Sequence, residues 1–549
     1  MLRLIPLGGL GEIGLNMTVF ECAGSMMVVD AGLMFPEDHM LGVDFVIPDM
    51  SYVRLNKNRL KGVVLTHAHE DHIGALPFLL REVHVPVFGT AFTLGLVRQK
   101  LNELEVAAPA GLQVISPDAP LTLEPFTIDF IPVGHSVVDG VGLAIHSPEG
   151  LVVHTGDFKL GPGAFSGMAT DIQKFARLGE QGVLALMSDS TNIEREGATL
   201  PETRIEETLS QVVAASPGRI IVALFASNIA RIQMVADIGR KAGRKVIVSG
   251  RNIEASVEIA KALGFLHIAA GSDVSIDLVQ DFPDEEVLII TTGSQGEPMS
   301  ALARMASGAH KQIKIKKGDT VVLSSKFIPG NERAITRIID NLYRRGAEVV
   351  YEKIADVHVS GHAFRDELRQ MIQVIHPRYF IPVHGEYRHL VLHGRLAQTM
   401  GIDRGNILLA ENGQVIEFEN GVGRIHGSVD SGRVLIDGKG VGDVGRAVLK
   451  ERRMLSEDGF VAVTLAFDED TGVIVYGPEI VSRGFVFETE TGYLLEDAHC
   501  VVLEVVEELP PETPHRMERI RNRLQAALRQ YFFFTIGRRP FILPFIMEV

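Results

Sequence analysis

The chain has 549 residues, a length that suggests two to four domains at about 150 residues each, and 46% of them are hydrophobic. Its formal net charge of −16 argues against an indiscriminate nucleic-acid binder, because phosphate backbones are held chiefly by lysine and arginine. The two cysteines, Cys22 and Cys500, provide neither a disulfide framework nor a thiolate metal cluster. No apolar run reaches the roughly 18 residues of a membrane span, so we expect a cytoplasmic protein that does not associate with membranes.

The amino-terminal segment is rich in glycine. The run Leu7-Gly8-Gly9-Leu10-Gly11-Glu12-Ile13-Gly14 lacks the Lys-Ser/Thr ending of a phosphate-binding loop, so we interpret it as a turn. Asp30 follows the strand-like residues Val28-Val29. Its carboxylate either caps the turn after this strand or orients a histidine in a neighbouring site.

The next segment carries the strongest chemical signal in the chain. After the apolar run Val63-Val64-Leu65, the residues Thr66-His67-Ala68-His69-Glu70-Asp71-His72 place three imidazoles and an aspartate close together. One ion cannot accept all of them without crowding, whereas two metal ions about 3.5 to 4 Å apart can share them. We expect His67 and His69 to point to one ion, while Asp71 and His72 reach another from a loop or a first helical turn. Solvated loop histidines are the alternative.

Three further polar residues also follow short apolar runs. His135 comes after Phe130-Ile131-Pro132-Val133-Gly134, Asp157 comes after the run that begins at Leu151, and His384 comes after Tyr379-Phe380-Ile381-Pro382-Val383. Polar residues at the carboxyl ends of strands are the usual components of an open site on a sheet. These three residues are therefore candidates for the remaining metal ligands.

Short apolar strands alternate with helical patterns in the middle of the chain. Residues 218–224 predict a strand, residues 228–242 a helix and residues 245–248 the next strand. This alternation is typical of a parallel sheet covered by helices, and it predicts an α/β fold.

We place the domain boundaries where this pattern begins and ends. The predicted ranges are 1–205 for the first part of a metal-binding domain, 206–365 for an inserted α/β domain, 366–440 for the second part of the metal-binding domain, 441–454 for a linker and 455–549 for a C-terminal domain of strands and helices.

The segment His358-Val359-Ser360-Gly361-His362 has the composition of an anion-binding loop. Its glycine allows close approach of the backbone, and the serine hydroxyl and backbone N–H groups can donate hydrogen bonds. His362 can supply a proton near neutral pH, or it can be a structural histidine beside a glycine turn.

The order of these motifs resembles a known family. Asp30, the His67 to His72 run, His135 and Asp157 are similar to the successive motifs of the metallo-β-lactamase superfamily. The later segments are similar to those of the β-CASP nucleases: Ser188-Asp189-Ser190-Thr191-Asn192, Phe225-Ala226-Ser227-Asn228, Thr291-Thr292-Gly293-Ser294-Gln295-Gly296-Glu297-Pro298, Ile328-Pro329-Gly330-Asn331-Glu332 and His358-Val359-Ser360-Gly361-His362-Ala363. Over nearly its whole length the chain resembles the bacterial ribonuclease J family.

The resemblance implies a fold and a ligand set. The fold is a metallo-β-lactamase αββα sandwich with an inserted β-CASP α/β domain and a small α+β C-terminal domain. The resemblance also implies that the last domain forms the contacts of a homodimer or tetramer. The resemblance assigns one divalent ion to His67, His69 and His135, the other to Asp71, His72 and His384, and assigns Asp157 to both. Zinc and manganese both suit imidazole and carboxylate ligands.

The resemblance also implies an activity. The implied reaction is 5′-to-3′ exonuclease and endonuclease cleavage of single-stranded RNA, which leaves 5′-monophosphates. The implied role is in RNA decay and in the maturation of rRNA and mRNA. The resemblance also implies partners in a decay complex. The implied catalytic residues are Asp71, Asp157 and His362, and Asp30 would orient a ligand histidine. The implied binding site for a 5′-phosphate end consists of Ala226, Ser227, Asn228, His358, Val359, Ser360, Gly361 and His362.

Two departures from the family pattern and two alternative functions accompany this hypothesis. Gly134 stands where a hydroxyl residue is expected, and Ile229-Ala230 replaces another side chain near the RNA, so the balance of exonuclease and endonuclease cutting is open.

A thioester or lactam hydrolase would use the same metal platform but not the long insertion. A non-catalytic RNA-binding or scaffold subunit of a decay complex is the other alternative, although such a subunit typically lacks some of the ligands.

Overall fold

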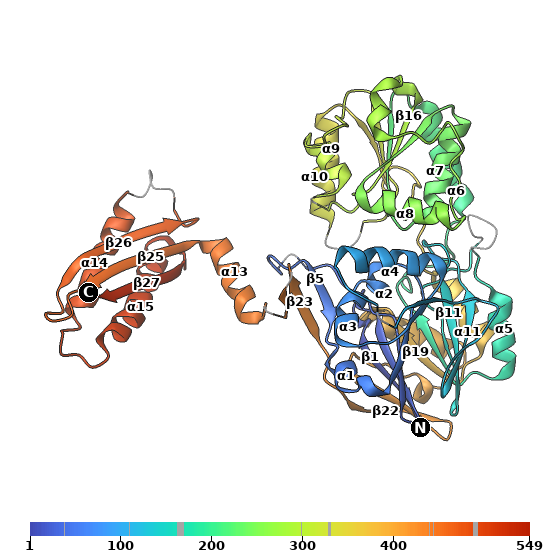
Figure 1. The fold of residues 1–549 in the computed structure, drawn as a ribbon, viewed down its shortest axis with the longest axis horizontal. Coiled ribbons are helices and arrows are strands. Elements are labelled where there is room, and N and C mark those ends of the chain that lie inside the picture. Colours follow the sequence, from blue (N-terminus) through green and yellow to red (C-terminus); the bar gives the residue numbers. More distant parts are fainter. Residues whose placement is uncertain are drawn as a thin grey trace. The chain divides into compact units, whose positions relative to one another are not determined.

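Most of the runs expected as strands are strands in the computed structural model (Figure 1). The structure describes residues 1–37, 39–108, 110–161, 169–297, 299–327, 331–438, 440–442, 444–486 and 492–549. Pro298 and Ile328-Pro329-Gly330, which belong to two of the segments that resemble β-CASP nucleases, lie outside the described residues. The chain divides into one unit of Met1–Phe35 with Val46–Val434 and a second unit of Pro36–Phe45 with Leu435–Val549.

Two β-sheets form the inner layers of the first unit. One has the order β22-β21-β1-β3-β4-β6-β7-β8, and the other has the order β19-β13-β12-β11-β10-β9. The strands of the first sheet are β1 (Leu2–Gly8), β3 (Met17–Cys22), β4 (Ser25–Val29), β6 (Leu60–Val64), β7 (Val87–Gly89), β8 (Leu112–Val114), β21 (Gln414–Glu419) and β22 (Val422–Ser428). Those of the second are β9 (Leu121–Leu123), β10 (Phe126–Pro132), β11 (Val141–Ser147), β12 (Gly150–His154), β13 (Ala185–Asp189) and β19 (Tyr379–Val383).

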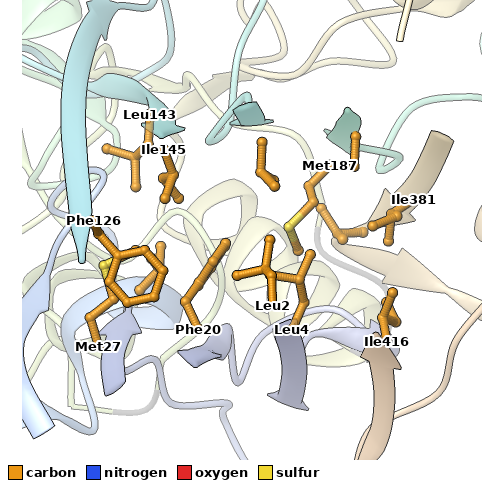
Figure 2. Packing of buried hydrophobic residues seen from close by; sticks show 14 of the residues in the cluster. Leu2, Leu4, Phe20, Met27, Phe126, Leu143, Ile145, Met187, Ile381 and Ile416 are labelled. Atoms are coloured by element: carbon orange, nitrogen blue, oxygen red, sulfur yellow. The ribbon is translucent and has the colours of Figure 1, made fainter. Parts of the chain in front are cut away.

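The main core lies between these two sheets. Figure 2 shows Leu4 and Phe20 of the first sheet facing Leu143 and Met187 of the second, and none of the four is exposed to solvent. Each such side chain contributes about 1.5–3 kcal/mol when it leaves water, so this layer holds the sheets together.

Helices cover the outer face of each sheet. Helices α2 (Glu70–Ile73), α3 (Leu76–Glu82) and α4 (Ala91–Glu103) pack through one apolar cluster on the first sheet. Helices α5 (Ile172–Gln181), α11 (Arg365–Ile375) and α12 (Tyr387–Thr399) pack through another on the second. The expected αββα sandwich is therefore confirmed. Other short elements before residue 442 include α1 (Ser51–Leu55), β2 (Leu10–Gly11), β5 (Phe45–Pro48), β20 (Gly385–Glu386), β23 (Arg433–Asp437) and β24 (Gly440–Val441).

The inserted region is a second layered structure within the first unit. Its five strands are all parallel and have the order β15-β16-β14-β17-β18, with bounds β14 (Ile220–Ala223), β15 (Lys245–Ser249), β16 (Val287–Thr291), β17 (Thr320–Leu323) and β18 (Glu348–Val350). Helices α6 (Glu202–Ala215), α7 (Ile229–Lys241) and α8 (Arg251–Ala262) pack on one face, and α9 (Ala301–Ser307) and α10 (Glu332–Arg344) on the other (Figure 1). Helix α6 spans the boundary that we expected at residue 206.

The second unit contains the C-terminal strands and helices. Strand β25 (Phe460–Phe467) pairs with β26 (Ile474–Arg483) in antiparallel and with β27 (Phe541–Glu548) in parallel orientation. Helices α14 (Gly492–Glu507) and α15 (Arg516–Ile536) pack on one face of this sheet. Helix α13 (Arg446–Asp458) begins in the range 441–454 that we expected to be a linker and ends beyond it. Among the described residues, no helix is both long enough and apolar enough to cross a membrane.

Candidate metal centre

The predicted ligands lie just beyond the carboxyl ends of strands from both sheets. His67 and His69 are in the loop after β6, and Asp71 and His72 form part of helix α2. His135, Asp157 and His384 follow β10, β12 and β19. The fold therefore brings together residues that are more than 300 positions apart in the chain, as in the 3.1 Å contact between Asp71 Oδ2 and His384 Nε2.

One group of possible ligands consists of His67, His69, His135 and Asp157. His69 Nδ1 lies 3.1 Å from His67 Nε2 and 3.1 Å from His135 Nε2. Asp157 Oδ2 lies 3.6 Å from His67 Nε2 and 3.8 Å from His135 Nε2. Two ligand atoms of a tetrahedral ion lie about 3.3 Å apart when each metal–ligand bond is about 2.0–2.1 Å. The four atoms can therefore surround one divalent ion.

A second group consists of Asp71, His72, Asp157 and His384. His72 Nε2 lies 3.3 Å from Asp157 Oδ2 and 3.6 Å from Asp71 Oδ2. His384 Nε2 lies 3.1 Å from Asp71 Oδ2 and 3.8 Å from Asp157 Oδ2. These spacings also fit one divalent ion, and Asp157 belongs to both groups.

The shared oxygen of Asp157 fits a position between two cations. Asp157 Oδ2 is buried and has no hydrogen-bond partner among the described residues. Burial would raise the pKa of Asp157, but His384, His72 and other imidazoles hold this pKa well below its usual range, so the carboxylate is ionised. An ionised oxygen that is buried without a hydrogen bond costs several kcal/mol, and divalent cations remove this cost.

The imidazoles around Asp157 differ in protonation. Burial lowers the pKa of His67 and of His135, and it lowers the pKa of His69 to about 4, so all three are neutral and can bind metal. Burial would also lower the pKa of His72 and of His384, but Asp157 and the other carboxylates around them raise it. The second group therefore attracts a positive charge.

Asp30 lies behind the second group. Its Oδ2 is 2.7 Å from His72 Nδ1, and it accepts a 2.8 Å hydrogen bond from Thr66 Oγ1. Its Oδ1 accepts a 2.8 Å hydrogen bond from the Thr66 backbone N–H. One carboxylate thus holds both the ring of His72 and the loop after β6, which is not the turn after its own strand β4.

His362 lies beside the metal centre and is held by Asp189. His362 Nδ1 is 2.7 Å from Asp189 Oδ2 and 3.9 Å from Asp157 Oδ2. Burial would lower the pKa of His362, but Asp189 and Asp157 raise it. A protonated imidazole in this place can give a proton to an oxygen atom.

The remaining residues of the expected anion site fall into two parts. Asn192 donates hydrogen bonds to Ser360 Oγ at 2.6 Å and to the His362 carbonyl at 3.1 Å, while a Cβ on Gly361 would lie 2.6 Å from His135 Cε1. His358 Nδ1 is buried without a partner among the described residues, and Val359 is packed in an apolar cluster. Ala226 packs against the same cluster, and Ser227 and Asn228 lead into helix α7.

The sequence interpretation missed three residues of the site. Asp189 and Thr191 support His384, with a 2.6 Å contact from Thr191 Oγ1 to His384 Nδ1. Asn16 Nδ2 lies 3.1 Å from His72 Nε2 and donates to the Asp71 carbonyl at 3.0 Å. Asp189 could have been found, because it ends an apolar strand as the expected ligands do. Asn16 gives no such signal.

Comparison with known proteins covers almost the whole chain. Family profiles match it with four descriptions: Metallo-beta-lactamase superfamily over residues 11–169, Ribonuclease J, beta-CASP domain over 217–342, Zn-dependent metallo-hydrolase RNA specificity domain over 346–404, and Ribonuclease J C-terminal domain over 447–549. Ribonuclease J2 of Bacillus subtilis (strain 168) is 42% identical over 547 residues, which are 100% of this chain and 98% of that protein. The chain belongs to the ribonuclease J family.

Two further matches agree with this assignment. Ribonuclease J 1 of Streptococcus pyogenes serotype M3 is 39% identical over 99% of this chain and 97% of its own length. A crystal structure of a protein of unknown function from Enterococcus faecalis V583 aligns with a TM-score of 0.52 and 15% identity over 76% of this chain and 99% of its own, which shows a common fold.

Family membership and the clustered ligands together define the class of protein. As a member of the ribonuclease J family with two adjoining groups of histidine and aspartate ligands, the chain is a metal-dependent ribonuclease that binds RNA and divalent metal.

Proposed function

We propose that this ribonuclease degrades single-stranded RNA from the 5′ end, also cuts internally, and leaves 5′-monophosphate products. The observation that carries the proposal is the pair of ligand groups that share the buried Asp157 Oδ2. His67, His69 and His135 would hold one ion, Asp71, His72 and His384 the other. We propose zinc or manganese, since the groups contain imidazole and carboxylate but no thiolate.

Bound divalent ions would supply an acidified water and polarise the phosphoryl group. The protein's own side chains orient the metal ligands and supply the proton for the leaving group. Asp30 and Thr191 hold the rings of His72 and His384. Because His362 Nδ1 is bonded to Asp189, the transferable proton of His362 is on Nε2, from which it can reach the departing 3′ oxygen.

We propose that the 5′-phosphate binds between the segment of Ala226, Ser227 and Asn228 and the segment from His358 to His362. The buried, unpartnered His358 Nδ1 and the Ser360 hydroxyl supply polar groups there. A terminal phosphate held beside the metal centre would place the first phosphodiester for cleavage, which gives 5′-to-3′ removal of nucleotides.

The two competing functions have less support. A non-catalytic RNA-binding or scaffold subunit does not require both complete ligand groups. A lactam or thioester hydrolase would not require an inserted α/β region that contacts the metal centre, as this one does where the Gly361 carbonyl accepts a 2.7 Å hydrogen bond from His135 Nδ1.

The deciding experiment follows a single-stranded RNA that carries a 5′-monophosphate and a 3′ label, with Mn²⁺ or Zn²⁺ present. Wild-type protein should shorten the RNA progressively from its 5′ end, and Asp71→Ala and His362→Ala should abolish or strongly slow this ladder. His146→Ala, which removes a half-exposed histidine of β11 paired with Asp129, is the matched control and should keep the wild-type ladder. RNA that is bound but remains intact with both metals would favour the scaffold function instead.

We also propose that the domain limits 1–205, 206–365, 366–440 and 455–549 apply and that the last domain joins two copies of the chain in a homodimer, or four in a tetramer. Strands β26, β25 and β27 present the exposed side chains of Tyr476 and Met547 on either side of Ala466, on the face away from the buried core. Light scattering should give the mass of a dimer or tetramer for wild type and a lower mass for Met547→Lys, and a monomeric wild type would refute this part of the proposal.

A further inference from the structure

Glu202 joins two buried cations that come from different parts of the first unit. Its Oε1 lies 2.8 Å from Lys159 Nζ, and its Oε2 lies 2.6 Å from Arg231 Nη2. Lys159 follows strand β12 of the sandwich, whereas Glu202 and Arg231 belong to helices α6 and α7 of the inserted region. Lys159 is 4% exposed and Arg231 is 2% exposed, so water does not screen these pairs as it does surface ion pairs.

The Lys159 end of this network is part of the metal-ligand loops. Lys159 comes two residues after Asp157, and its backbone N–H donates a 2.8 Å hydrogen bond to the carbonyl of Gly134, which precedes His135. A displacement of Lys159 would therefore move two of the residues that surround the first metal position.

The Arg231 end fixes both segments of the proposed 5′-phosphate site. The backbone N–H of Arg231 donates to Asn228 Oδ1 at 3.0 Å. Its side chain donates through Nη1 to the Val357 carbonyl at 3.0 Å and to Ser324 Oγ at 3.0 Å. Val357 directly precedes His358, so Arg231 contacts the end of one segment through its backbone and the residue before the other segment through its guanidinium.

The network has one positive charge in excess, because Glu202 is the only carboxylate paired with the two cations among the described residues. Burial would raise the pKa of Glu202, but Arg231 and Lys159 lower it to about 2, so Glu202 is ionised. His358 does not add a charge, since burial and the nearby Arg231 lower its pKa to about 3. A 5′-phosphate would supply the missing negative charge, and a 5′-hydroxyl would not.

We propose that Lys159, Glu202 and Arg231 couple recognition of a 5′-phosphate to the placement of the Asp157 loop, so that a phosphorylated RNA end increases the rate of cleavage. This inference rests on the proposed function. Glu202 acts here as a positioning residue: it contacts neither the metal ligands nor the reacting phosphate, and it transmits the position of Arg231 to Lys159.

The test compares two single-stranded RNAs of one sequence, one with a 5′-phosphate and one with a 5′-hydroxyl, in full-length protein loaded with metal. The readout is the ratio of kcat/KM for the two RNAs. In Glu202→Gln this ratio should fall at least about fivefold, which is the lower end of ordinary coupling between sites. The loss should come from the phosphorylated RNA.

A second variant guards against a folding defect. Glu202→Gln leaves two buried cations without a carboxylate, which is strongly destabilising, whereas Lys159→Met combined with Glu202→Gln removes one charge of each sign. Asp319→Asn is the matched control, because it breaks the buried Arg219–Asp319 pair at the opposite end of β14 from Asn228. In the double variant the ratio of kcat/KM for the two RNAs should fall, as in Glu202→Gln. In Asp319→Asn this ratio should stay at its wild-type value.

The outcomes separate this inference from the function on which it rests. If wild-type protein cleaves both RNAs equally, there is no end recognition, and both the proposed 5′-end function and the coupling are wrong. If wild-type protein discriminates and the folded, metal-loaded double variant keeps the wild-type ratio, the proposed function stands and the coupling is wrong.

Discussion

His362 Nδ1 lies 2.7 Å from Asp189 Oδ2, and this contact links the proposed proton donor to the support of a metal ligand. The other oxygen of the same carboxylate, Oδ1, lies 3.4 Å from His384 Nδ1. Asp189 ends strand β13, between the strands that lead to Asp157 and His384. One buried carboxylate therefore orients two imidazoles with different functions.

Asp189→Asn should impair both functions, whereas His362→Ala should impair one. We expect His362→Ala to lower kcat by about 10²–10⁴-fold, the usual contribution of a general acid, with its metal content unchanged. Asp189→Asn should lower kcat and also weaken metal binding by about 10–100-fold, because it removes an outer partner of a ligand histidine. Single-turnover rates and metal content by mass spectrometry distinguish the two.

Asp129→Asn is the control for the preceding prediction, since Asp129 pairs with a histidine on the exposed side of strands β10 and β11. Asp129→Asn should change neither the single-turnover rate nor the metal content. Equal metal loss in His362→Ala and Asp189→Asn would mean that His362 is itself a ligand.

The variants Asp71→Ala and Asp157→Ala should differ in how they change the metal sites of the protein. Asp71 belongs to the second ligand group, whereas Asp157 belongs to both the first and the second. We expect titration calorimetry of the metal-free protein to show one remaining site in Asp71→Ala and two weakened sites in Asp157→Ala. Because metal binds the folded state, added Zn²⁺ or Mn²⁺ should raise the Tm of wild type more than that of either variant. If one of the two sites kept its wild-type affinity in Asp157→Ala, the shared position of Asp157 would be contradicted.

The sequence predicted the fold and most of the site because the signals are local. The His67 to His72 run and the polar residues after β10, β12 and β19 each follow an apolar strand, and strands of one layer end at a common edge. The αββα sandwich and the β-CASP insertion came from the family resemblance, which itself depends on such local motifs.

What the sequence did not predict depends on contacts between distant segments. Glu202, Lys159 and Arg231 are ordinary charged residues in the sequence, and only the packing of helices α6 and α7 against the loop after β12 buries them together. Helix α14 (Gly492–Glu507) was not assigned from the sequence either, although Leu494, Ala498 and Val502 recur at helical spacing and are buried. The range 441–454, expected to be a linker, contains the larger part of helix α13, none of whose residues is buried.

Gly361 is expected to accept no side chain. A Cβ at this position would lie 2.6 Å from His135 Cε1 and 2.9 Å from Ser136 Oγ, and the Gly361 carbonyl accepts a 2.7 Å hydrogen bond from His135 Nδ1. We therefore expect Gly361→Ala to displace the His135 ring, weaken one metal site and lower activity. Gly405→Ala is the control, because no atom lies within 4 Å of the corresponding Cβ. Full metal affinity in Gly361→Ala would show that the loop shifts without disturbing His135.

Glu202 should make the stability of the protein depend on pH in the acidic range. Its pKa in the folded protein is about 2, compared with the ordinary value of 4.5, because Arg231 and Lys159 outweigh burial. A depressed carboxyl pKa stabilises the folded state above the unfolded pKa, and this contribution is lost as the pH falls toward the folded pKa. The shift corresponds to roughly 3 kcal/mol at neutral pH.

Urea unfolding of chelator-treated protein checks this dependence, since metal release then contributes nothing. Wild type should be more stable than Glu202→Gln at pH 6, and the difference should shrink steadily between about pH 4.5 and about pH 2, where Glu202 becomes protonated in both states. Glu206 lies on the same helix as Glu202 and makes an exposed pair with Lys241 of helix α7. Glu206→Gln should therefore follow wild type over the whole range. A constant difference between wild type and Glu202→Gln across this range would mean that the carboxyl stabilises the protein through packing rather than through its charge.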